Sequence, residues 1–222
     1  MSRVDRTFRK HRMGAVGFAA LTFVAVTPIF AGTLTVEVRK HDGTPLQGAV
    51  VTVEAESPTL PSAAPIKGIM DQMNLAFVPD VLVIPVHSTV QFPNSDAISH
   101  QVYSFSDAKH FQLPLYRGKP YPPVSFDQVG VATLGCNIHD NMLAYVVVTA
   151  AQFYGRSNGS GGWSEEIPAG RYHVRVWHPL LNEPQEIERT LQIGADPAAV
   201  DFKLTKNLRP APLKGRPHSW DY

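Results

Sequence analysis

The sequence has a single cysteine, Cys136, in 222 residues, so no disulfide can form within the chain. It also lacks an excess of charge, since Lys and Arg number 20, Asp and Glu number 19, and the formal net charge is +1. Proteins that bind nucleic acid usually carry a strongly basic patch. Beyond the first 31 residues, no segment keeps the apolar period of a helix over a useful length. These absences argue against a disulfide framework, a nucleic-acid partner and a helical bundle.

The pattern that remains is typical of many short strands. Gly and Pro are plentiful, at 16 and 19 residues, and Val, Thr, Tyr and Phe recur in short runs between them. Such runs, separated by turn residues, predict strands joined by turns. We therefore expect an all-β fold. About seven strands within residues 70–149 predict a Greek-key sandwich, with a longer irregular stretch over residues 106–123.

The first 31 residues have the layout of a secretory signal. A basic start precedes an apolar stretch from Met13 to Phe30, and small residues follow at Ala31 and Gly32. This layout predicts export with cleavage after Ala31. An uncleaved membrane anchor is the alternative, because the apolar run approaches the length that spans a bilayer. We expect a periplasmic location in a bacterium, with membrane contact only if the segment stays uncleaved.

Export makes the lone cysteine informative. An unpaired cysteine in a secreted protein is a buried bystander, half of an intermolecular bridge, or a reactive or metal-bound thiolate. Here Cys136, His139 and Met142 follow one another at three-residue intervals, in a loop between two apolar strands. A thiolate, an imidazole and a thioether at this spacing can converge on one ion. The loop therefore favours the metal-bound alternative.

The donor types in this loop match a blue-copper site. Such a site uses two imidazoles and one thiolate in a trigonal arrangement, with a weak axial ligand that is often Met. The second imidazole must come from another strand, and His100 is well placed, since it follows a polar loop at residues 93–99 and opens a strand. The predicted ligands are His100, Cys136, His139 and Met142. Zinc also accepts Cys and His, but a Met ligand disfavours it.

At these residues the sequence resembles the cupredoxins. Residues 75–149 are similar to a cupredoxin domain, and the Cys-x-x-His-x-x-Met spacing resembles that of the amicyanin group. The whole chain is also similar to proteins labelled methylamine utilisation proteins, which carry a similar loop and a Trp-His-Pro triplet, here residues 177–179. The resemblance implies one type 1 copper ion per chain, alternating between Cu(II) and Cu(I). It also implies a redox partner protein, such as a cytochrome or an amine dehydrogenase.

Two positions depart from the cupredoxin pattern. Gln101 follows the upstream histidine, where many cupredoxins have an asparagine that helps to tie the two ligand loops together. The turn before Val90 is His87-Ser88 rather than a glycine. Neither change removes a ligand. The first puts the residues around the ligands, and hence the redox potential, in question.

Two other functions compete with electron transfer. A copper oxidase or nitrite reductase would need further histidines, typically His-x-His pairs, and the sequence has none. We therefore predict that the protein is not an enzyme. A periplasmic copper carrier or storage protein is the stronger alternative, although such proteins tend to use several Met or His ligands with open coordination. The single Cys in a Cys/His/Met loop favours electron transfer.

The segments on either side of the predicted copper unit resemble the two ends of a carboxypeptidase-regulatory or prealbumin-like sandwich. Residues 32–69 hold two strands and a linker, and residues 150–205 hold several more. Neither segment alone has enough strands to bury both faces of a sandwich. We expect them to pack together, with the cupredoxin unit at residues 70–149 inserted between them. Two consecutive small domains are the alternative, and residues 206–222 read as a flexible basic tail.

Overall fold

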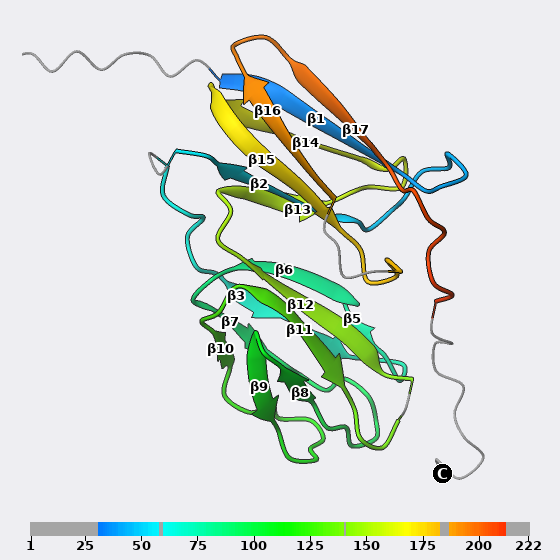
Figure 1. Ribbon diagram of the computed structural model, residues 1–222. Coiled ribbons are helices and arrows are strands. Elements are labelled where there is room, and N and C mark those ends of the chain that lie inside the picture. The colour runs from blue at the N-terminus through cyan, green and yellow to red at the C-terminus, as the bar shows by residue number, and fades with distance from the viewer. Residues whose placement is uncertain (1–30, 58–59, 140, 183–186, 212–222) are drawn as a thin grey trace, which may run out of the picture.

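The computed structural model describes residues 31–57, 60–139, 141–182 and 187–211. Every regular element in that part is a β-strand, which confirms the all-β prediction (Figure 1). None of the described residues forms a helix long and apolar enough to cross a membrane. The predicted signal segment, apart from its last residue, lies outside the described residues.

Strands from both ends of the described chain form one sandwich, here called the flanking sandwich. Its strands are β1 Ala31–Arg39, β2 Val50–Ala55, β13 Phe153–Arg156, β14 Gly162–Pro168, β15 Gly170–Trp177, β16 Ile187–Ile193 and β17 Ala198–Lys203. One sheet has the order β14-β1-β17 and the other β13-β2-β15-β16 (Figure 1). β1 pairs antiparallel with β14 and parallel with β17. The two segments that flank the predicted copper unit thus share both sheets.

Alternating apolar residues form the core of the flanking sandwich. Leu34, Val36 and Val38 on β1 are fully buried, and so are Val51 and Val53 on β2. Successive side chains of a strand point to opposite faces, so a two-residue apolar period directs one whole face inward. Burying a side chain of this size contributes roughly 1.5–3 kcal/mol. The core therefore follows directly from the period visible in the sequence.

The remaining strands form a second body, here called the central unit. Its strands are β3 Lys67–Ile69, β4 Asp71–Gln72, β5 Phe77–Val78, β6 Val81–Pro85, β7 Ser88–Gln91, β8 Tyr103–Ser106, β9 Lys109–Gln112, β10 Val124–Phe126, β11 Gly130–Gly135 and β12 Leu143–Thr149. A five-stranded sheet has the order β6-β12-β11-β8-β9, and a three-stranded sheet the order β10-β7-β3. β4 and β5 make a short ladder. Side chains including Ile84, Phe92 and Phe126 fill the core.

Two details of the central unit differ from the sequence-based expectation. The stretch at 106–123 was expected to be irregular, but it contains β9, which pairs with β8 in a hairpin. Its side chains alternate between half-buried and exposed, which is a weak signal at an edge of the sheet. β3 begins at Lys67, within the predicted linker, because it pairs in parallel with β7. Both strands are short and carry little local pattern; the hairpin with β8 defines β9, and pairing with the distant β7 defines β3.

An apolar contact joins the flanking sandwich to the central unit. Val50 of β2 packs in one cluster with Val81 and Val147 of the central unit. The ring of Tyr145 meets the ring of Trp177 edge to face, with centroids 5.6 Å apart. Chain connection and side-chain packing therefore both link the two bodies.

The first part of the predicted flexible tail is attached to the flanking sandwich. Leu208 packs against its core, and the Arg209 N–H donates to the Leu180 carbonyl at 2.8 Å. The Arg209 guanidinium also donates to the Pro179 carbonyl at 2.7 Å. Residues 206–211 are thus held by specific contacts, and residues 212–222 lie outside the described residues.

Candidate metal centre

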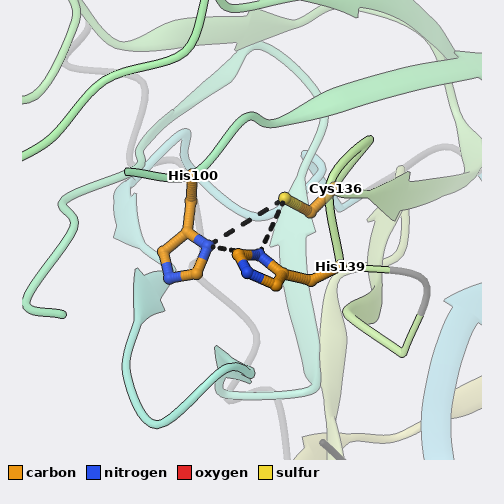
Figure 2. A group of neighbouring side chains, drawn as sticks. All are labelled: His100, Cys136 and His139. Carbon is orange, nitrogen blue, oxygen red and sulfur yellow. Dashed lines mark hydrogen bonds between the residues drawn. The ribbon is translucent and has the colours of Figure 1, made fainter. Parts of the chain in front are cut away.

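Three of the four predicted ligands converge at one end of the central unit (Figure 2). Cys136 directly follows β11, and His139 lies in the loop between β11 and β12. His100 comes from the loop between β7 and β8, where its backbone exchanges two hydrogen bonds of 2.9 Å with Tyr116. These bonds fix the loop that carries His100 against the segment around Tyr116. Residue 140, within the ligand loop, lies outside the described residues.

The donor atoms of these three residues lie around one point. The Nδ1 atoms of His100 and His139 are 3.0 Å apart. The Cys136 Sγ atom lies 4.0 Å from the first nitrogen and 3.8 Å from the second. All three atoms fall within 4.8 Å of one another, and theirs is the one group of at least three such side chains found among the described residues.

These separations suit a single bound metal ion. Metal–nitrogen distances of about 2.0 Å and metal–sulfur distances of about 2.3 Å, at trigonal or tetrahedral angles, place two nitrogens about 3.3–3.5 Å apart. The same geometry places nitrogen and sulfur about 3.5–3.7 Å apart. The observed distances differ from these values by only a few tenths of an ångström. The three donor atoms therefore have the spacing of ligands to one metal ion.

The two imidazoles differ in how deeply they are buried. His100 is fully buried and Cys136 is 4% exposed, whereas His139 is only partly buried. Burial of His100 and Cys136 shields two of the three donors from water and fixes their rotamers. His139 thus forms the side of the cluster nearest to solvent.

Met142 lies at the end of the same loop and is 2% exposed. Its side chain belongs to the same core cluster as Cys136. Its backbone N–H donates to the His139 carbonyl at 3.0 Å, which closes a turn between the two predicted ligands. The structure thus places Met142 in the ligand loop and inside the core, while its role as an axial ligand remains a prediction.

Asp96 contacts one of the grouped histidines and was not among the residues predicted from the sequence. The buried His100 Nε2–H donates to Asp96 Oδ2 at 2.7 Å. The same carboxylate accepts the backbone N–H groups of Asn74 and Leu75, at 2.6 and 3.0 Å. A carboxylate on the far nitrogen of a ligand histidine fixes the tautomer and the ring orientation. Asp96 therefore orients the His100 ring so that Nδ1 faces Cys136 and His139, and the signal for it was an acidic residue four positions before the histidine.

The electrostatics of the cluster favour a thiolate. Burial raises the pKa of Cys136, but the hydrogen bonds it accepts, chiefly from His100 and the Gln101 N–H, outweigh this and lower the pKa to about 6. Burial lowers the pKa of His100, but its contacts with Cys136 and Asp96 reverse this and raise it. A cysteine with this pKa is mostly ionised at neutral pH, which is the state that binds a metal.

The neighbourhood of Cys136 explains the departure at Gln101. The Gln101 backbone N–H points to the Cys136 sulfur at 3.5 Å, so this link does not depend on the side chain at that position. The Asn94 amide supports the histidine loop by donating to the Ile98 and Tyr116 carbonyls, both at 2.9 Å. Asn94 thus links the histidine loop to the segment around Tyr116, while the Gln101 N–H makes the contact with the cysteine loop.

Gly135, before the cysteine, is required by a close ring. A Cβ atom added there would lie 2.7 Å from the Tyr103 ring, which occupies the space of a side chain. Tyr103 pairs with Gly135 across β8 and β11. The tyrosine ring therefore covers the backbone next to Cys136.

The other described histidines stay apart from the cluster. His110 is exposed on β9 and stacks edge to face on Phe105. His173 contacts Glu188 at 2.8 Å on the outside of the flanking sandwich. His178 lies near the junction of the two bodies and is not one of the grouped residues.

No model of a known protein family matches the sequence, and no curated protein matches it. Solved structures that resemble the chain include a purple cupredoxin from Nitrosopumilus maritimus, with 24% identity over 37% of this chain and 99% of that one, and a TM-score of 0.34. An amicyanin variant matches at 23% identity over 45% and 98% of the two chains, with a TM-score of 0.35.

A copper-containing nitrite reductase from Thermus scotoductus matches at 22% identity over 50% of this chain but only 28% of its own, with a TM-score of 0.36. Each identity is below 25% and each TM-score is below 0.5. The case for a metal centre therefore rests on its own geometry.

Proposed function

We propose that the protein is an exported copper protein of the cupredoxin type that carries single electrons. The convergence of His100 Nδ1, His139 Nδ1 and Cys136 Sγ within 4.8 Å carries this proposal. Met142, buried in the same loop, completes the proposed ligand set. A bound copper ion would supply a one-electron couple between Cu(II) and Cu(I). Two imidazoles, a thiolate and a weak thioether are the donor set of blue-copper sites.

The chain's own residues hold the proposed ligands in one arrangement. Cys136 follows directly on a strand of the five-stranded sheet, and His100 is fixed by Asp96 on one side and by backbone bonds to Tyr116 on the other. Electron transfer is favoured when the ligands move little between the two oxidation states. A site anchored on strands and buried in a core meets that requirement.

His139 is the proposed route for electrons to a partner. It is the least buried of the three grouped residues, and the neighbouring Ile138 is 48% exposed. Weak redox encounters use small interfaces, so an exposed apolar side chain beside a ligand suits brief docking. A cytochrome or an amine dehydrogenase in the periplasm is the proposed partner class. The proposal assigns no catalytic reaction to the protein.

Visible absorption and EPR spectra of the mature protein loaded with Cu(II) test the proposal. We expect an intense band in the red part of the visible spectrum and small copper hyperfine splitting. Both should disappear in Cys136→Ser, because the band requires a thiolate on copper. His110→Gln is the matched control, since this exposed histidine lies outside the cluster, and its spectra should equal those of the parent.

A colourless copper-loaded protein, or spectra that persist without Cys136, would overturn the electron-transfer proposal. Tight copper binding without the thiolate band would instead favour a carrier or storage protein. Preferential binding of zinc over copper in direct competition would identify a zinc site, which also accepts Cys and His ligands.

A further inference from the structure

A cleft of about 650 Å³ lies at the junction of the two bodies, apart from the metal centre. Residues from both bodies line it: Gly48, Arg156 and His178 from the flanking sandwich, and Asp80, Asn141 and Tyr145 from the central unit. Concave sites at domain junctions, with a few convergent polar groups, are common positions for small ligands. The polar groups of the lining determine which class of ligand the cleft can bind.

Arg156 supplies the central cation of the cleft. Three of its five N–H groups donate to the Gly48 carbonyl, the Val81 carbonyl and Asp80 Oδ1, at 3.4, 3.1 and 3.3 Å. These bonds hold the guanidinium in place across the junction. The other two N–H groups have no acceptor among the described residues. A fixed guanidinium with spare donors is a recognition element for an anionic oxygen.

His178 supplies a second donor of defined direction. Its Nδ1 accepts the Leu180 backbone N–H at 3.2 Å, so the neutral ring carries its proton on Nε2. Burial and then the charge of Arg156 lower the pKa of His178 to about 4. The ring is therefore neutral at physiological pH and offers one N–H to the cleft.

The charges around the cleft favour an anion. Arg156 and Lys40 act on His178 as positive charges, and Asp80 acts as a negative one. Arg209 acts on Tyr145 as a further positive charge, and its guanidinium is held on the Pro179 carbonyl. Of these four charged groups three are positive, and the carboxylate, which lines the cleft with Arg156, already bonds that arginine.

The walls of the cleft also include apolar side chains. Val81, Leu143, Pro179 and Leu180 line it, and its volume is far larger than an inorganic ion requires. A ligand that fills the cleft would therefore have an apolar part as well as a charged group. One guanidinium and one imidazole N–H suit the two oxygens of a carboxylate.

We propose that this cleft binds a small organic carboxylate, with its charged group on Arg156 and His178 and its apolar part on Leu143 and Leu180. The binding site is separate from the metal centre, although Asn141 and Leu143 of its lining are the neighbours of Met142 in sequence.

Proton NMR of the histidine rings in the metal-free full-length protein tests this inference. Sodium butyrate is the probe, butyramide is its uncharged counterpart, and sodium chloride keeps the ionic strength constant. We expect butyrate to shift the His178 ring resonance in a saturable way and to raise the pKa of His178, while butyramide does neither. His178→Gln identifies the resonance by removing it.

Arg156→Gln should weaken butyrate binding by about tenfold, because a hydrogen bond to a charged group is lost. The matched control is Arg175→Gln, since Arg175 bonds Glu54 and Glu188 on the flanking sandwich and does not line the cleft. Its affinity should equal that of the parent. If Arg156→Gln fails to fold, Leu180→Ala tests the same cleft through the apolar part of the ligand, and it should weaken binding by about threefold.

Equal shifts from butyrate and butyramide, no saturable shift from butyrate, or unchanged affinity in Arg156→Gln and Leu180→Ala would each overturn the inference. Because the protein carries no copper in this experiment, its outcome is independent of the electron-transfer proposal.

Discussion

The two bodies of this protein distribute their buried polar groups in opposite ways. The buried polar side chains of the central unit are Gln72, Ser88, Asn94, His100, Ser104 and Thr149. The described part of the flanking sandwich contributes one, Ser157, which bonds the Ala49 N–H and the Leu46 carbonyl. Buried polar groups are retained where they are hydrogen-bonded and where function needs them. The buried polar groups are thus concentrated in the body that holds the proposed metal centre, and the core of the flanking sandwich is almost wholly apolar.

The largest expected effect is a loss of stability in the flanking sandwich. Phe202 is fully buried in the flanking core, and Phe202→Ala should lower the free energy of unfolding by about 3–5 kcal/mol. Chemical denaturation measures this change. The copper spectrum of the folded variant should match that of the parent, because the metal centre belongs to the other body. A changed spectrum would show that the geometry of the metal centre depends on the core of the flanking sandwich.

The next largest effect is a loss of metal affinity on changing Asp96, whose carboxylate bonds His100. Asp96→Asn can keep an acceptor oxygen for the Asn74 N–H, but it replaces Oδ2, which accepts from the Leu75 N–H and His100 Nε2, with an amide NH2. Loss of such a partner typically weakens metal binding by about 10–100-fold. Competition with a copper chelator measures the affinity, and Asp107→Asn in the β8–β9 turn is the control. Unchanged affinity would remove Asp96 from the metal centre.

A smaller effect at acidic pH tests the junction between the bodies. The pKa of His178 is about 4 in the folded protein, below the ordinary histidine value of 6.5. The unfolded chain therefore takes up this proton first, so stability is lost as pH falls from about 6.5 through 4. Since the ring is partly exposed, the loss should be about 1–2 kcal/mol. Denaturation at pH 7 and pH 4 should show less acid destabilisation in His178→Gln; equal losses would exclude His178 as a source.

The smallest effect lies on the outer face of the scaffold. Arg175 bonds Glu54 and Glu188 at 2.7 and 2.8 Å, on side chains that are 30–41% exposed. Exposed ion pairs contribute about 0–1 kcal/mol, and salt screens them. Arg175→Ala should lower stability by less than about 1 kcal/mol, with the difference shrinking in high salt. A larger loss that salt does not change would indicate packing by the arginine stem.

The metal centre was predictable where its residues are close in sequence. Cys136, His139 and Met142 occupy one short loop, so their spacing alone indicated a common ion. His100 was found because the donor set required a second imidazole and a polar loop preceded it. Asp96 was missed, because an acidic residue in a polar loop is common and only its contact with a buried ring gives it meaning.

The sequence by itself determined the all-β class, the apolar period of β1 and the Cys-His-Met loop, because each depends on residues within a few positions of one another. Only the tertiary structure decided the pairing of β1 with β17, the edge strand β9 and the cleft that Arg156 and Asp80 line. These features join residues that are far apart in the chain or that carry little local pattern. Hydrogen bonds and packing between segments that folding brings together define them, so no local period could reveal them.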